Sequence, residues 1–149
     1  MKKRKGDPWM SASEYGHTLP TFSINLLVKN IELSCKFYSE VFEAEIKYRD
    51  EDFAAVNLHG LEFMLHADHT FENHPWTDSL GNNNERGLGV ELRVLGINPD
   101  KVEKLARKHK SVIFSETSDK PHGWRETVVQ DPDGYVWAAG IKIPNLTSA

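Results

Sequence analysis

Glu91 and Arg93 are the first side chains in this sequence whose types and spacing could do chemistry. They lie two residues apart in a segment that alternates apolar and polar residues, so a β-strand would place both on one face. On a solvent-facing sheet such a pair is unremarkable. In the wall of a cavity each charge needs a partner, and the two could pair with each other or share a polar ligand. Both interpretations stay open at this point.

A second alternating segment, residues 61–66, carries Glu62, Met64 and His66 on the face opposite its apolar residues. Glu62 and His66, with Glu91, have the donor types that divalent metals bind, so a metal site built from these three is one hypothesis. The other is that His66 orients a ligand or is simply hydrogen-bonded.

Other histidines lie close by in the sequence or in a later loop. His69 and His74 follow His66, but their spacing matches no short zinc module and the chain has no paired cysteines. His122 lies in residues 119–123, which we expect to form a loop. If this loop covers a cavity mouth, His122 would lie near His66 as an acid/base or ligand-binding pair.

These residues need elements to position them, and the first half of the chain predicts a strand, a helix and three strands. Asn30 suits a helix N-cap, and apolar residues at helical spacing follow it. His59 and Gly60 predict a tight hairpin between the last two strands. The predicted elements are a strand at 22–28, a helix at 31–42 and strands at 44–49, 53–58 and 61–66.

The same order of elements recurs in the second half. Asn98 and Pro99 predict the start of a helix, and residues 131–134, Asp-Pro-Asp-Gly, predict a turn before the last strand. The predicted strands are at 89–94, 112–116, 125–130 and 135–141. This repetition indicates an internal duplication. Since each half has too few strands to bury its own sheet, we expect the halves to pair, within one chain or across a dimer.

We expect one domain with a tail at each end. The segment between the halves lacks periodicity, as a connection would. The basic run at residues 2–5 has no apolar anchor, so deleting residues 1–5 should leave stability unchanged. The boundaries are 1–20 for the N-terminal tail, 21–143 for the domain (21–66, connection 67–86, 87–143) and 144–149 for the C-terminal tail.

Composition excludes several classes of function. The net charge is −4, and four of the 18 basic side chains lie in residues 1–5, so the remainder is acidic enough to repel nucleic acid. No apolar run is long enough to cross a membrane, and no secretory signal pattern follows the basic run. The single cysteine, Cys35, cannot form an intramolecular disulfide, which fits a cytoplasmic location and leaves it no expected catalytic role.

Three short motifs resemble those of a known family. They are Ser34-Cys35-Lys36-Phe37-Tyr38 in the first helix, Gly123-Trp124-Arg125-Glu126, and Asp131-Pro132-Asp133-Gly134-Tyr135. Together they resemble the vicinal oxygen chelate superfamily, also called glyoxalase/bleomycin resistance/dioxygenase proteins. The resemblance implies an α+β fold in which two tandem βαβββ modules form curled mixed sheets around a cavity. It further implies frequent assembly as a homodimer and, in the enzymes of the family, one divalent metal.

The resemblance places the four metal ligands at Ser23, Met64, Gly89 and Ala138, none of which has the imidazole or carboxylate that such a metal requires. We therefore expect a metal-independent protein without a cofactor that binds a small molecule. The residues expected to line its cavity are Ser23, Asn25, Glu62, Met64, His66, Glu91, Arg93, His122 and Ala138.

Two alternatives remain. One is a lyase, isomerase or dioxygenase that uses one divalent metal held by Glu62, His66 and Glu91, a site one pleat away from the family positions. The other is a catalytically silent dimeric module whose cavity is filled by its own side chains. Neither predicts contact with nucleic acid or membrane. The ligand itself does not follow from the fold.

Overall fold

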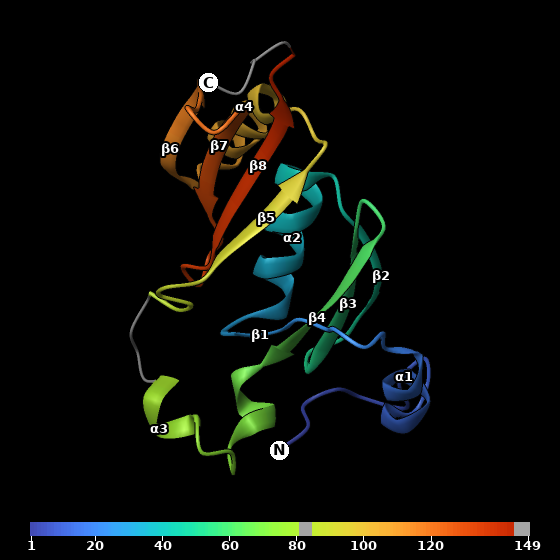
Figure 1. Ribbon diagram of the computed structural model, residues 1–149. Coiled ribbons are helices and arrows are strands. Elements are labelled where there is room, and N and C mark those ends of the chain that lie inside the picture. Colours follow the sequence, from blue (N-terminus) through green and yellow to red (C-terminus); the bar gives the residue numbers. More distant parts are fainter. Residues whose placement is uncertain (81–84, 145–149) are drawn as a thin grey trace. The chain divides into compact units, whose positions relative to one another are not determined.

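The computed structural model describes residues 1–80 and 85–144, and it divides the chain into two compact units. The first unit consists of residues 1–39 and 43–82, and the second of residues 40–42 and 83–149. Each unit contains a four-stranded mixed sheet with a helix between its first and second strands (Figure 1). The expected α+β fold with tandem modules is confirmed.

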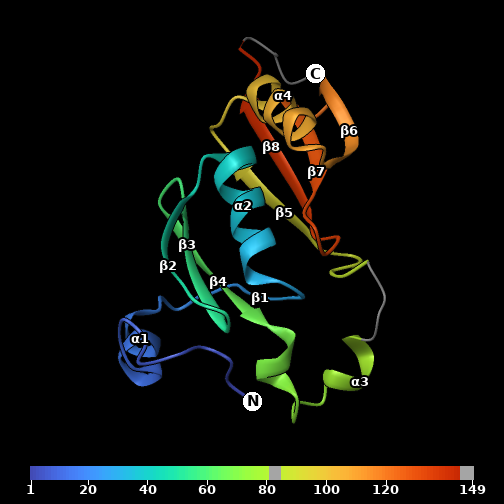
Figure 2. The ribbon, with the colours of Figure 1, turned by 180° about the vertical axis from the view of Figure 1, so that it is seen from behind.

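The first unit contains a sheet of strand order β1-β4-β3-β2, in which β1 is parallel to β4 and the other pairs are antiparallel. Figure 2 shows this sheet from behind, with α1 beside it. The elements of this unit are α1 (Ala12–Thr18), β1 (Asn25–Val28), α2 (Ile31–Phe42, whose last three residues belong to the second unit), β2 (Glu45–Arg49), β3 (Phe53–Leu58), β4 (Leu61–Ala67), η1 (Asp68–Phe71) and α3 (Thr77–Leu80).

Local signals explain where these elements begin and end. The Asn30 side chain accepts a hydrogen bond from the Leu33 backbone N–H and caps α2 at the predicted residue. His59 and Gly60 both have positive φ, 49° and 96°, which is the geometry of a two-residue hairpin between β3 and β4. Phe63 and Leu65 on β4 are fully buried, as the alternation predicts.

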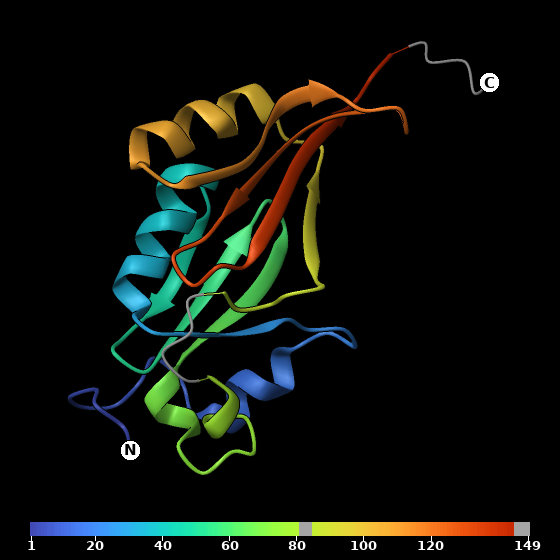
Figure 3. The same cartoon turned by 90° about the vertical axis from the view of Figure 1, so that its left-hand side faces the viewer.

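The second unit repeats this arrangement. Its sheet has the order β5-β8-β7-β6, again with only the first pair parallel. The helix α4 lies along β6, β7 and β8 (Figure 3). The elements of this unit are β5 (Glu91–Leu95), α4 (Pro99–His109), β6 (Val112–Asp119), β7 (Trp124–Gln130) and β8 (Val136–Lys142). The common strand order confirms the internal duplication.

The predicted turn at residues 131–134 is present. The Asp131 carboxylate accepts hydrogen bonds from the backbone N–H groups of Asp133 and Tyr135, and Gly134 takes a φ of 97°. Trp137, which follows the turn, is buried in the core. The turn therefore fixes where β8 begins.

The structure differs from the sequence-based expectation in several places. The expected N-terminal tail contains α1, and β1 begins at Asn25 instead of residue 22. The alternation in residues 61–66 predicts that Leu61 faces the core with Phe63 and Leu65, but Leu61 is exposed because it starts β4 directly after the hairpin. Residues 81–84 of the expected connection and 145–149 of the expected C-terminal tail lie outside the described residues.

None of the helices in residues 1–80 and 85–144 combines the length and the apolar character needed to cross a bilayer.

Candidate functional site

The site begins with the N-terminal segment, which folds against the first sheet. Ser11 and Glu14 form a capping box: the Ser11 hydroxyl accepts from the Glu14 N–H, and the Glu14 carboxylate accepts from the Ser11 N–H. These bonds stabilise the N-terminal end of α1. Trp9 stacks on Tyr48 of β2 with ring centroids 5.2 Å apart, and Tyr15 meets Phe53 of β3 edge-on at 5.1 Å.

Tyr15 also fixes α1 to β4 by a polar contact. Its hydroxyl donates to Glu62 at 2.9 Å, and Lys47 binds the other oxygen of that carboxylate at 2.5 Å. Burial raises the pKa of Glu62, but the bonds from Lys47 and Tyr15 outweigh it and hold that pKa below its usual value. Burial, helped by Glu62, raises the pKa of Tyr15. Glu62 is therefore an ionised anchor for α1.

A buried carboxylate holds the start of the chain. Asp52 is 2% exposed and accepts hydrogen bonds from the backbone N–H of Lys3 at 2.7 Å and of Arg4 at 3.3 Å. His69 Nε2 lies 2.6 Å from the same carboxylate. Burial raises the pKa of Asp52, but these bonds lower it further than burial raises it. The basic run, for which the sequence indicates no apolar anchor, is thus held by polar contacts of its backbone.

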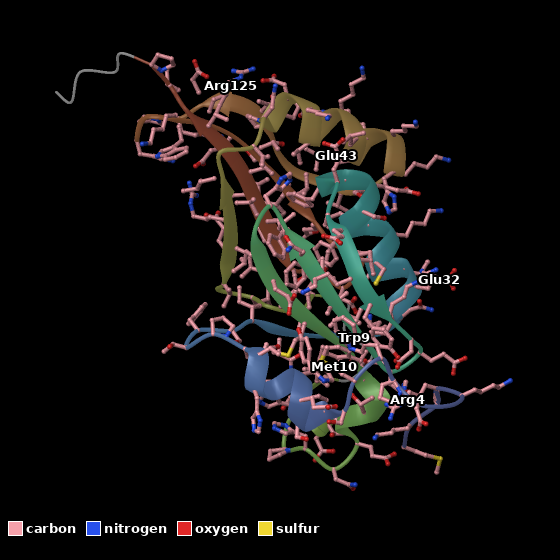
Figure 4. All side chains as sticks on the ribbon, turned by 90° about the vertical axis from the view of Figure 1, so that its right-hand side faces the viewer. Arg4, Trp9, Met10, Glu32, Glu43 and Arg125 are labelled. Atoms are coloured by element: carbon pink, nitrogen blue, oxygen red, sulfur yellow. The ribbon has the colours of Figure 1, made fainter. Side chains whose placement is uncertain are left out.

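Between this segment and the sheet lies a pocket of about 650 Å³. Figure 4 shows Arg4, Trp9 and Met10 gathered on the N-terminal segment that forms part of it. Most of the lining is apolar or aromatic. The lining includes Arg4, Trp9, Tyr15, Tyr48, Asp50, Phe53, Met64, His66 and Phe71. All of them belong to the first unit.

His66 is the central polar group of this pocket. Its Nδ1 lies 2.6 Å from the Asn25 side-chain oxygen on β1, and its ring contacts Phe53 at 4.8 Å and Phe71 at 5.4 Å. Burial lowers the pKa of His66 below 6.5, although the charge of Asp50 acts in the opposite direction. The imidazole is therefore neutral at physiological pH.

Only some of the predicted lining residues of the first half line the pocket in the structure. Met64 and His66 line the pocket. Asn25 and Glu62 contact residues that line it, namely His66 and Tyr15. Ser23 precedes β1, is exposed, and donates to the Pro20 carbonyl.

The predicted residues of the second half form a separate cluster. Arg93 binds Glu91 at 2.7 Å and Glu126, and His122 lies 3.2 Å from Glu126. Ala138, which pairs in register with Arg93, is buried. The segment containing His122 is the tight turn between β6 and β7. Because His122 and His66 belong to different units, their pairing stays a prediction.

Sequence reasoning missed Glu126 and most of the pocket. Glu126 is 4% exposed and lies beneath Gly140, where a Cβ would come within 2.8 Å of the Glu126 side chain. A glycine opposite a charged strand residue could have indicated this. The segment Ser11-Ala12-Ser13-Glu14, which has the spacing of a capping box, could have predicted α1.

Cys35 has no role at the site. It is buried, and burial raises the pKa of its thiol to about 11, although Arg49 acts in the opposite direction. A thiol with that pKa is almost entirely protonated near neutrality and is a poor nucleophile.

The residues present do not fit the divalent metal of the family's enzymes. Ser23 and Gly89 lie before strands β1 and β5, and Met64 and Ala138 offer no hard donor. Within residues 1–80 and 85–144, no three His, Cys, Asp or Glu side chains are gathered as metal ligands would be. Glu62 and His66, two of the three residues in the displaced-site hypothesis, are instead bound to Tyr15 and Asn25.

Comparison with known proteins identifies the family. Residues 16–139 match the Glyoxalase/Bleomycin resistance protein/Dioxygenase superfamily. The chain belongs to this superfamily. The match begins inside α1 and ends in β8, so it covers both units of this glyoxalase-superfamily protein. No protein of curated function matches the chain.

Solved structures of other proteins share the fold of this chain. A glyoxalase/bleomycin resistance protein/dioxygenase from Nocardioides has 18% identity and a TM-score of 0.66, over 92% of this chain and 96% of that one. A family enzyme from Burkholderia phytofirmans PsJN has 16% identity and a TM-score of 0.67, over 81% and 97%. TioX from Micromonospora sp. ML1 has 16% identity and a TM-score of 0.60, over 86% and 100%. At these identities the likeness establishes the fold of this superfamily member and nothing finer.

Proposed function

We propose that this superfamily member is a metal-independent binding protein that takes a small, largely apolar molecule into the pocket of its first unit. The observation that carries this proposal is the pocket itself. Its volume of about 650 Å³ lies within the range of about 300–1,000 Å³ that is typical of small-molecule sites.

The lining supports a flat ligand with aromatic character. The rings of Tyr15, Phe53, His66 and Phe71 form a continuous series of contacts along the pocket, with centroids 4.8 to 5.4 Å apart. Aromatic rings offer large apolar faces at low cost in side-chain entropy, and an aromatic ligand could pack against them. Met10 and Met64 add side chains that adapt to an irregular shape.

Metal independence is supported by the contacts of the candidate donors. A metal would have to displace Lys47 from one carboxylate oxygen of Glu62 and Tyr15 from the other. The metal-dependent lyase, isomerase or dioxygenase of the alternative hypothesis therefore gains no support from these residues. A cytoplasmic location is part of the proposal and rests on the buried free thiol of Cys35.

The proposal is tested with the neutral fluorescent probe N-phenyl-naphthylamine. We expect saturable binding to the wild-type chain, measured as an increase in probe fluorescence. Met64→Trp fills the pocket from β4 and should weaken binding at least tenfold. The matched control is Leu95→Trp, which places the same ring at an exposed strand position of the second unit and should leave binding unchanged.

The two variants give a clear decision. Circular dichroism and thermal melting establish that both are folded. Absence of saturable binding to the wild type, or equal binding by wild type and a folded Met64→Trp variant, would refute the pocket as the binding site.

A further inference from the structure

The hydrogen bond between His66 and Asn25 determines what the imidazole offers to a ligand. An amide oxygen can only accept, so Nδ1 of His66 must carry the hydrogen in the 2.6 Å contact with the Asn25 side-chain oxygen. A neutral imidazole has a single N–H, which leaves Nε2 with a free lone pair. His66 lines the pocket and Asn25 does not, so the ring turns Nδ1 toward β1 and Nε2 toward the pocket.

Nε2 is therefore an acceptor without a donor. Within residues 1–80 and 85–144, the His66 ring makes one hydrogen bond, the one between Nδ1 and Asn25, and Nε2 makes none. A half-buried acceptor gains from a hydrogen bond with a donor on the ligand, and it penalises a ligand that presents another acceptor.

Asp50 adds a negative charge to the same pocket. Its carboxylate accepts from the backbone N–H groups of Asp52 and Phe53 and from the Tyr48 hydroxyl at 2.7 Å. These three donors are neutral, and within the described residues no lysine, arginine or histidine lies within 4.0 Å of it. The charge is thus solvated by dipoles but not neutralised, and it stands beside the rings of Tyr48 and Phe53.

Other charged groups at the pocket have oppositely charged partners. Asp52 is opposed by the Arg4 guanidinium at 3.8 Å and by His69 at 2.6 Å. The terminal ammonium of Met1 binds Glu72 at 2.5 Å. Lys2, which also lines the pocket, is exposed to solvent. Of the two carboxylates that line the pocket in the described part of the chain, Asp50 is the one without a counterion.

We propose that the pocket selects a planar aromatic cation that carries an N–H donor, with the donor bound to His66 Nε2 and the positive charge placed by Asp50 among the aromatic rings. This inference rests on the proposed function and names the ligand class for that pocket. Aromatic faces favour cations through their quadrupole, which adds to the effect of the carboxylate. An anionic ligand would instead have to use Arg4, which already opposes Asp52.

Three planar tricyclic probes of similar size separate donor from charge. Proflavine is a cation with N–H donors, acridone is neutral with one N–H donor, and the acridine carboxylate is an anion without a donor at its ring nitrogen. Affinities are measured by fluorescence titration and isothermal calorimetry on the full chain. We expect proflavine to bind most tightly, acridone less tightly, and the acridine carboxylate at least tenfold more weakly than proflavine.

Two variants assign these preferences to residues. His66→Phe keeps a ring between Phe53 and Phe71 but removes the acceptor, and it should weaken proflavine and acridone by about tenfold each. Asp50→Asn keeps an oxygen for the two backbone N–H groups but removes the charge, and it should weaken proflavine alone. The matched controls are His17→Phe, an exposed histidine on α1 that does not line the pocket, and Asp78→Asn, an exposed carboxylate on α3. Both should bind all three probes like the wild type.

The outcomes distinguish this inference from the function on which it rests. Tightest binding of the acridine carboxylate, or equal loss for proflavine and acridone in Asp50→Asn, overturns the cationic ligand class. If N-phenyl-naphthylamine binds and none of the tricyclic probes does, this inference fails and the binding function stands. If no probe binds, both fail.

Discussion

Single residues at the pocket couple its chemistry to pH. Burial holds the pKa of His66 below its usual value of about 6.5, so the unfolded chain takes up a proton at His66 more readily than the folded chain does. Folding stability from neutral His66 is therefore complete above about pH 6.5 and is lost as the pH falls below it.

We accordingly predict that the wild-type chain loses more melting temperature between about pH 7.5 and pH 5.5 than His66→Phe does. The difference between the two chains isolates His66 from carboxylates that titrate in both. A histidine NMR titration should place the wild-type midpoint below that of a model peptide. Identical pH profiles for the two proteins would contradict the burial of an uncharged imidazole.

The contact between Tyr15 and Glu62 is the second residue-level prediction. Tyr15→Phe keeps the ring against Phe53 and removes the hydroxyl, so we expect it to cost about 1 kcal/mol of unfolding free energy. A double-mutant cycle with Glu62→Gln, measured by urea denaturation, should give a coupling of about 0.5–1.5 kcal/mol. Glu45→Gln, an exposed carboxylate on β2, serves as the control and should show no coupling to Tyr15. A cycle that sums to zero would mean that the bond does not stabilise the docked helix.

Among the elements, the N-terminal segment contributes most to the site. Its α1 depends on a local capping box, but its place against the first sheet depends on Trp9, Tyr15 and the contacts of Asp52. The segment supplies one side of the pocket, and strands β2, β3 and β4 supply the other. The pocket therefore exists only when the segment is docked.

Deletion of residues 1–5 should therefore destabilise the protein, in contrast to the sequence-based expectation. The deletion removes the Lys3 and Arg4 backbone donors from a carboxylate that is 2% exposed. Leaving a buried acceptor partly unsatisfied costs about 1–3 kcal/mol. Urea denaturation measures the loss, and Lys5→Ala, which changes an exposed side chain, is the control. An unchanged midpoint in the deletion variant would show that Asp52 recruits water in place of the chain terminus.

At the scale of the whole molecule, we predict a negative result with metals, because no suitable donor set is gathered within residues 1–80 and 85–144. Purified protein should carry no stoichiometric divalent metal, and nickel, zinc, manganese or iron should not raise its melting temperature. A real site at a hundredfold excess over Kd would add about 2.7 kcal/mol, a shift of several degrees. Metal-induced stabilisation that disappears in both His66→Ala and Glu91→Ala would overturn this prediction and favour the metal-dependent enzyme.

We also predict a homodimer in solution. The apolar residues of the N-terminal segment are not the basis of this prediction, because Trp9 and Tyr15 pack on the sheet of their own unit. Other apolar side chains remain exposed, including Phe22 and Leu88 at 75% and Phe114 at 65%. Large exposed apolar groups of this kind mark association surfaces where they are contiguous. Light scattering should give twice the chain mass of 17.0 kDa, and a clean species of that single mass would contradict a dimer.

The sequence alone determined the βαβββ order of each half and its duplication, because these are encoded in short-range patterns. The α2 bounds followed from an Asn30 cap and helical spacing, the β3–β4 hairpin from His59-Gly60, and the last turn from Asp131 and Gly134. The alternation on β4 likewise separated Met64 and His66 from the core residues. Each of these signals spans a few neighbouring residues, so no knowledge of distant contacts is needed to read it.

Only the tertiary structure decided which residues surround the pocket. Tyr15 meets Glu62 across 47 residues of sequence, and Lys3 meets Asp52 across 49. The N-terminal segment looked like a tail because seven residues of α1 are too few to be stable by propensity alone, and packing on the sheet makes the difference. Asp50 and Tyr48 come to line the pocket in the same way, since they enclose it only together with the distant N-terminal segment.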